Sequence, residues 1–232
     1  MDFTVIVESI PALIEQGLRL TLELLFLSLV IGMVCAVIVA LLRLSGIPGV
    51  THVAYAFVYF FRSTPLLVQF FLIYYGLGQF RPELQALGLW QFFREPFWCA
   101  ITALTLNTTA YTSEMIRGGI QSVPHGQIEA ARACGMSRVT VFRRIILPLA
   151  IRQALPAYSN EVVLMLHATA LASTITLMEL TGLAGRIASR TFDPVSAYVA
   201  VGLIYLVITL VLTRGLKWVE WKSTAYLRPR GG

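Results

Sequence analysis

Charged side chains are scarce in this chain, and their scarcity indicates its class. They account for 13% of the 232 residues, whereas hydrophobic residues account for 57%. An ordinary soluble domain does not need so large an apolar fraction, so the composition indicates a membrane protein. Cysteine is equally sparse. Cys35, Cys99 and Cys134 form no CxxC pair, which argues against a disulfide framework and against a redox or metal motif of that type.

The short motifs of common enzyme classes are also missing. There is no GxxxxGK[ST] loop, and neither Lys217 nor Lys222 has glycines arranged to cradle a phosphate. HExxH and GxSxG are absent, and His52, His125 and His167 are too scattered to be metal ligands. We therefore expect this chain to be no enzyme, with no catalytic residue, no metal site and no cofactor of its own.

Long apolar segments predict the architecture. A transmembrane helix needs about 20 mainly apolar residues. Glycine and proline at 46–49 break the pattern after the first such segment, and an apolar, aromatic stretch at 50–61 predicts a helix along the interface. Thr64-Pro65 then begins the second span, because proline suits a first helical turn. We expect an all-α integral membrane protein with five spans, at about residues 20–43, 63–80, 97–116, 154–178 and 194–214.

Basic residues predict the orientation of the spans. They are concentrated in residues 117–152 and after residue 213, and basic loops favour the cytoplasm. The N-terminus is therefore expected outside and the C-terminus inside, with residues 221–232 as a cytoplasmic tail. Arg186 and Arg190 are exceptions, which either pack against acids such as Glu179 and Asp193 or lie in a re-entrant segment. Because the basic residues flank apolar runs, nucleic acid is not an expected partner.

The longest polar segment, residues 121–148, lies between the third and fourth expected spans. Its pattern predicts a helix at 127–134, a left-handed turn at Gly135 and a second helix at 137–147 capped by Ser137. Pro148 is expected to end the second helix. Helical spacing predicts one apolar edge, formed by Val139, Phe142 and Ile146.

Seven fixed positions within this segment carry a family resemblance. Glu129-Ala130-Ala131, Gly135, Ile145 and Leu147-Pro148 match in full the EAA motif, EAA-x3-G-x9-I-x-LP, of permease subunits of bacterial ABC importers. The flanking sequences FRSTP (61–65), NTTAYTSE (107–114), RGGI (117–120) and YSNEV (158–162) are similar to the polar amino-acid uptake branch. Over about residues 17–220, the chain resembles the M-type permeases of the histidine, lysine/arginine/ornithine and octopine or nopaline systems. Ser63 replaces the glycine usual in that family, and we expect little consequence.

The resemblance implies a type I importer fold in the bacterial inner membrane, with a periplasmic N-terminus and a cytoplasmic C-terminus. It implies a second homologous permease subunit, an ATPase dimer that binds ATP and Mg²⁺, a periplasmic solute-binding protein and surrounding lipid. Residues 127–148 would be the coupling helices that dock on the ATPase. The expected coupling residues are Glu129, Ala130, Ala131, Gly135, Val139, Phe142, Ile145, Leu147 and Pro148.

Polar side chains within the expected spans are candidates for the substrate path. Glu161 is the leading candidate for binding an ammonium or guanidinium group, and its alternative is a bond to Arg152 or to a neighbouring helix. Glu114 matches a family-wide position, which favours a structural or gating role. The remaining candidates more often serve helix packing; they are Asn107, Asn160, Gln69 and His167.

Two classes of function therefore follow from the sequence. The favoured one is a permease subunit of an ATP-driven importer for basic amino acids such as histidine, lysine, arginine or ornithine, with an opine as the alternative substrate. The other is a membrane scaffold that uses the same polar segment to recruit a different cytoplasmic protein.

Overall fold

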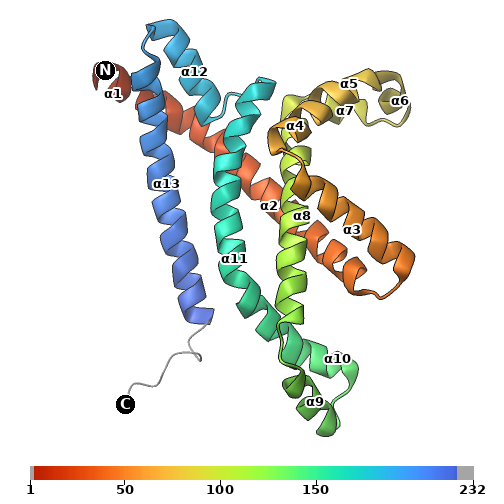
Figure 1. The fold of residues 1–232 in the computed structure, drawn as a ribbon. Coiled ribbons are helices and arrows are strands. Elements are labelled where there is room, and N and C mark those ends of the chain that lie inside the picture. Colours follow the sequence, from red (N-terminus) through yellow and green to blue (C-terminus); the bar gives the residue numbers. More distant parts are fainter. Residues whose placement is uncertain (1–2, 224–232) are drawn as a thin grey trace, which may run out of the picture.

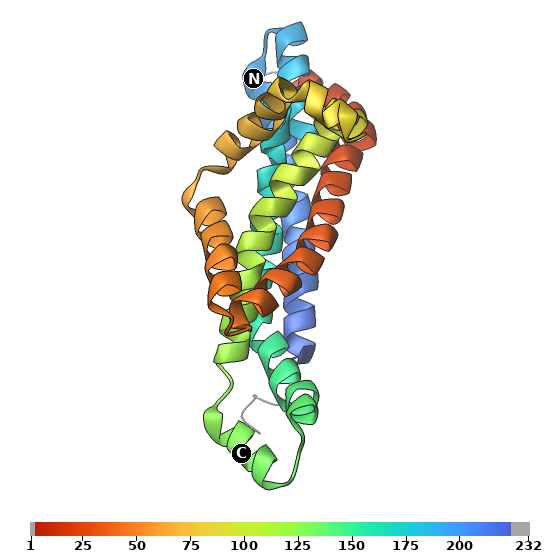
Figure 2. The same cartoon turned by 90° about the vertical axis from the view of Figure 1, so that its right-hand side faces the viewer.

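The computed structural model describes residues 3–223, which fold into a bundle of helices (Figure 1; Figure 2). The first helix is much longer than its expected span. α1 (Phe3–Ala12), a π-helical stretch (Leu13–Leu18) and α2 (Arg19–Leu44) follow one another without a turn. α2 contains the expected span at 20–43 and ends where Gly46 adopts a φ of +72°. Glycine suits this turn because it has no Cβ.

The next apolar region is sharply broken. α3 (Pro48–Ser63) is followed by α4 (Leu66–Phe71), a π-helical stretch (Leu72–Gly76) and α5 (Leu77–Gln79). The helix axis bends by 107° between the two halves of this region. Thr64 is extended at the break, as the residue before a proline favours, so the chain restarts its helix after Pro65.

α8 (Pro96–Gln121) is the central helix, reached through the short helices α6 (Arg81–Ala86) and α7 (Trp90–Phe93). It packs against α2, α3, α4 and α11. Its polar second half is enclosed by protein, as its composition predicts, since Thr108, Thr112 and Ser113 are all buried. Gly32 permits the close approach of α2, because a Cβ there would collide with the Thr108 methyl group.

The apolar core lies where α2, α4, α8 and α11 meet. Large buried side chains from all four helices fill it, including Leu24, Phe70, Leu104 and Leu166. Burying such a side chain contributes about 1.5–3 kcal/mol in water, but helices surrounded by lipid gain mainly from close packing. This core therefore fixes the relative positions of the helices that carry the polar candidates.

The second half of the chain folds around α11. α9 (His125–Ala133) and α10 (Arg138–Val141) lead through a π-helical stretch (Phe142–Ile146) into α11 (Leu147–Ala168). A 3₁₀ stretch (Thr169–Ile175), α12 (Leu180–Thr191) and α13 (Pro194–Ser223) complete the fold. Residues 221–223 of the expected tail at 221–232 belong to α13, and the remainder of that tail lies outside the described residues.

Two helices in the described part of the chain are long and apolar enough to cross a membrane, Ile6–Leu44 and Pro194–Ser223. The number rises to four if each of two bent helix pairs forms one span. Outward-facing apolar side chains on these helices, such as Val34 at 59% and Val211 at 65% exposure, suit contact with lipid. The polar α8 is not among these spans, so the five-span count stays a prediction.

Candidate functional site

The polar segment protrudes from one end of the bundle. Figure 1 and Figure 2 both show α9 and α10 beyond the ends of α2 and α13, opposite the end that carries α12. Two local predictions are confirmed. Gly135 adopts a φ of +78° after α9, and the Ser137 hydroxyl accepts a hydrogen bond from the Thr140 amide at 3.3 Å. These two residues set the turn between the helices.

The expected apolar edge of Val139, Phe142 and Ile146 is partly exposed. Val139 is 67% exposed, whereas Phe142 and Ile146 are half-buried. Val141, which is not part of that edge, is 2% exposed and is the valine that packs inward. Val139 is therefore available on the surface.

Pro148 does not end the second helix, so that expectation was wrong. The chain continues from α10 through the π-helical stretch into α11, with Pro148 in the first turn of α11. A proline removes a backbone donor and crowds the preceding turn, and a π-helical turn is a recognised way to accommodate such a defect. As a consequence, the protruding segment is joined to α11 by continuous helix.

The remaining coupling candidates divide between surface and interior. Glu129, Ala130 and Gly135 are exposed, while Ala131 is 6% exposed and packs inward. Phe142, Ile145 and Pro148 are half-buried, and Leu147 is 38% exposed. The exposed acid and alanine on α9 give the segment a surface that another helix can approach closely.

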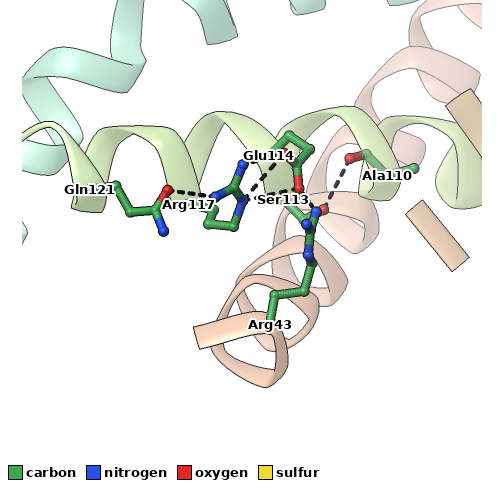
Figure 3. Close-up of polar contacts among 6 residues, drawn as sticks. All are labelled: Arg43, Ala110, Ser113, Glu114, Arg117 and Gln121. Atoms are coloured by element: carbon green, nitrogen blue, oxygen red, sulfur yellow. Dashed lines mark hydrogen bonds and ion pairs between the residues drawn. The ribbon is translucent and has the colours of Figure 1, made fainter. Parts of the chain in front are cut away.

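A charged cluster lies between the polar segment and the core. Glu114 on α8 forms ion pairs with Arg43 at the end of α2 and with Arg117, whose Nη2 lies 2.8 Å from its carboxylate (Figure 3). Arg117 also donates to Gln121. Glu114 therefore ties α2 to α8, which agrees with the structural role expected for it.

This cluster forms one wall of a cavity of about 400 Å³, which we call the arginine pocket. Arg62 enters it from α3 with its guanidinium 5.1 Å from the centre of the Tyr111 ring, and Arg43 lies 5.2 Å from that of Tyr55. The lining residues are Arg43, Tyr55, Val58, Tyr59, Arg62, Ser63, Tyr111, Glu114 and Arg117. Three arginines and a single glutamate give the pocket an excess of positive charge, which favours anionic groups.

Glu161 lies buried on α11, 4% exposed. Its hydrogen-bonding neighbour is Thr108 on α8, and Arg62 is the cation that acts on it. Thr108 thus links Glu161 to a neighbouring helix. Because Arg62 also lines the arginine pocket, a carboxylate and a guanidinium lie within electrostatic range of each other across α3, α8 and α11.

Gln69 and Asn107 hold the broken helix together. The Gln69 carboxamide donates to the carbonyls of Phe61 and Thr64 at 2.9 and 3.1 Å, and its oxygen accepts from Asn107 at 3.2 Å. These bonds satisfy carbonyls that the end of α3 leaves without helical partners. The expected helix-packing role therefore fits both residues.

The last two candidates lie away from the arginine pocket. His167 faces α13, where its Nε2 is 3.2 Å from the Thr209 hydroxyl. Asn160 is exposed and lines a separate cleft between α11 and α13, with Ser159 and Lys217. The structure therefore places Glu114 in the arginine pocket and Glu161 within electrostatic range of Arg62, and it joins Gln69 to Asn107. His167 and Asn160 lie apart from both groups.

Sequence reasoning missed the arginines of the pocket. In the sequence, Arg43 and Arg62 each stand at the end of an apolar run, where a basic residue usually marks a membrane boundary. Tyr55 and Tyr111 at helical positions on α3 and α8 were the available signal, since arginine commonly packs on an aromatic ring.

A helical bundle with buried polar residues and lipid-compatible outer helices is typical of a multi-pass membrane protein. Residues 28–223 match the family described as binding-protein-dependent transport system inner membrane component, and the chain belongs to that family. It is therefore an inner-membrane component of an ABC transporter.

Individual relatives indicate which transport systems the chain is similar to. The chain is 57% identical to the nopaline transport system permease protein NocM of Agrobacterium fabrum, over all of this chain and 96% of that protein. It is 45% identical to the histidine/lysine/arginine/ornithine transport system permease protein HisM of Escherichia coli K12, over 92% of this chain and 90% of that protein. A crystal structure of an amino acid ABC transporter with histidines superimposes with a TM-score of 0.86 at 38% identity, covering 96% of this chain and 99% of the other.

Proposed function

We propose that this chain is the permease subunit of an importer for basic amino acids or opines, and that residues 125–148 couple it to an ATPase. The continuous helix from the protruding segment into α11 carries this proposal. A push on α9 and α10 would be transmitted to α11 and to Glu161 as a rigid displacement. The scaffold alternative provides no reason for a charged pocket between α2, α3 and α8.

The partners follow from the same reasoning. An ATPase dimer would bind ATP and Mg²⁺ and receive the coupling segment, and a second homologous permease would complete the translocation path. A periplasmic solute-binding protein would deliver substrate at the opposite end, where α12 lies. This arrangement requires five spans, with the N-terminus periplasmic and the segment at 125–148 cytoplasmic.

The charge distribution supports an amphoteric substrate. An amino-acid carboxylate suits the guanidinium groups of the arginine pocket, and an ammonium or guanidinium side chain suits the buried carboxylate of Glu161. Glu114 is already occupied by two arginines, so it shapes the pocket and does not supply the cation contact.

Opines remain the alternative substrate because of one observation. The arginine pocket holds three guanidinium groups against one carboxylate. An opine carries a further carboxylate in addition to those of an amino acid, and it would use this positive excess more fully. The name of the nopaline permease relative agrees with this alternative.

The test is purification of the chain from its native membrane in mild detergent, followed by reconstitution into vesicles. We expect recovery of an ATPase subunit and ATP-dependent uptake of arginine, histidine or nopaline when the solute-binding protein is supplied. Recovery of the chain without any ATPase subunit would contradict the proposal.

A further inference from the structure

The end of the molecule opposite the coupling segment carries a rigidly held helix, α12 (Figure 1). Glu179 is fully buried and caps it, accepting hydrogen bonds from the Thr181 and Gly182 amides at 2.9 Å each. The Tyr205 hydroxyl on α13 donates to the same carboxylate at 3.1 Å. This anchoring fixes the start of α12 against α13.

One face of α12 is buried and the opposite face is open. Leu180, Leu183 and Ala184 pack inward as part of a second apolar cluster with α1 and α13. Arg186 and Arg190, four residues apart, are exposed, as is Ser189 between them. The apolar side of this amphipathic helix is therefore already used within the chain.

Arg186 and Arg190 have no ionic partner in residues 3–223. The ion pairs found there involve other arginines. Glu179 is occupied by its cap and by Tyr205, while Asp193 accepts hydrogen bonds from the amide and hydroxyl of Ser196. Packing against these two acids, one of the alternatives left open by the sequence, is thus not what the structure shows.

Phe192 adds an exposed aromatic ring beside the two arginines. It is 90% exposed, and its φ of +57° lies in the left-handed region. That conformation is unfavourable for a residue with a side chain. Arginine and aromatic residues are enriched where protein interfaces derive their affinity.

From these observations we infer that Arg186, Arg190 and Phe192 form a docking surface for the acidic surface of a soluble protein. The inference rests on the proposed function, which places α12 in the periplasm and makes the solute-binding protein the partner. Insertion of this face into lipid is disfavoured because its exposed side is polar apart from Phe192. Complementary charge would steer the partner to the end of the bundle farthest from the ATPase.

The test uses the assembled transporter in lipid nanodiscs and measures ATPase rate against the concentration of solute-loaded binding protein. Arg186→Glu with Arg190→Glu should raise the half-maximal concentration at least tenfold, equivalent to about 1.4 kcal/mol. Basal ATPase activity should be unchanged. The difference should shrink at high salt, because screening weakens exposed charge pairs.

Arg81→Glu is the matched control, since Arg81 is an exposed arginine on α6 at the same end of the molecule but on its other side. An unchanged half-maximal concentration in the double variant, or a rise no larger than in the control, would overturn the docking surface alone. A loss that depends on anionic lipid in the disc would also overturn it, by assigning the face to the membrane. A wild-type assembly that the binding protein does not stimulate would overturn the proposed function as well.

Discussion

At the scale of single residues, cation selectivity is expected to depend on Glu161. Its buried carboxylate lies beside Thr108 and within electrostatic range of Arg62. Glu161→Gln keeps the size and the hydrogen-bonding capacity but removes the charge. We expect the apparent affinity for arginine or lysine to fall roughly tenfold or more, because a buried carboxylate is a strong partner for a guanidinium or ammonium group. Competition uptake assays would measure this change.

Asn160→Ala is the control for that change. Asn160 is the adjacent residue, but it faces the cleft between α11 and α13 and not the arginine pocket. Uptake by this variant should resemble that of the wild type. Equal losses for cationic and neutral substrates in Glu161→Gln would instead assign Glu161 a purely structural role.

The sequence could indicate Glu161 but not its surroundings. A carboxylate inside an apolar stretch is costly and therefore conspicuous in any sequence. Arg62 is conspicuous only after folding, because the break at Thr64-Pro65 turns α3 so that its last turn meets Tyr111 on α8. The angle of such a break depends on tertiary packing, and sequence spacing does not encode it.

At the scale of elements, the turn between α9 and α10 determines whether force can reach α11. Gly135 adopts a φ of +78°, whereas proline is confined to a φ near −65°. We expect Gly135→Pro to abolish ATP-coupled uptake while the chain still inserts into the membrane. Glu129→Lys should do the same by reversing an exposed charge on α9. Uptake and membrane fractionation would be measured together.

Gly126→Ala is the matched control for the turn. Gly126 lies within α9 with open space around its Cα, so a methyl group there meets nothing, and alanine favours helix. This variant should transport normally. Normal uptake by Gly135→Pro or by Glu129→Lys would refute the coupling role of the segment.

The sequence predicted the end of α9 and the start of α10, because a single residue determines each of them. The left-handed turn at Gly135 and the cap at Ser137 follow from intrinsic properties of glycine and serine. Pro148 was misjudged because the helix continues through the π-helical stretch before it into α11. The periodicity of the sequence does not reveal such a stretch.

At the scale of the whole molecule, composition indicated a membrane protein, the long apolar segments predicted its helices, and the EAA motif predicted its family. The long unbroken helix at the start was not foreseen, since Glu8, Glu15, Arg19 and Glu23 interrupt its hydrophobicity. Arg19 and Glu23 pair with each other one turn apart at 2.9 Å, which lets charge remain within a continuous helix. A hydropathy pattern counts such paired charges as breaks, so it underestimates the length of the helix.

The orientation of the bundle can be tested at its two ends. Cys134 is exposed in the coupling segment, while Cys99 is buried and Cys35 is partly buried. In vesicles without ATPase subunits, a membrane-impermeant maleimide should label Cys134 only when the vesicles are inside-out. Phe192→Cys in a Cys134→Ser background should be labelled only when they are right-side-out, because Phe192 is 90% exposed at the opposite end. The Cys134→Ser chain alone sets the background.

Labelling of both positions from one side would require an even number of crossings between them. That result would be incompatible with a cytoplasmic coupling segment and a periplasmic α12 joined by the single span of α11.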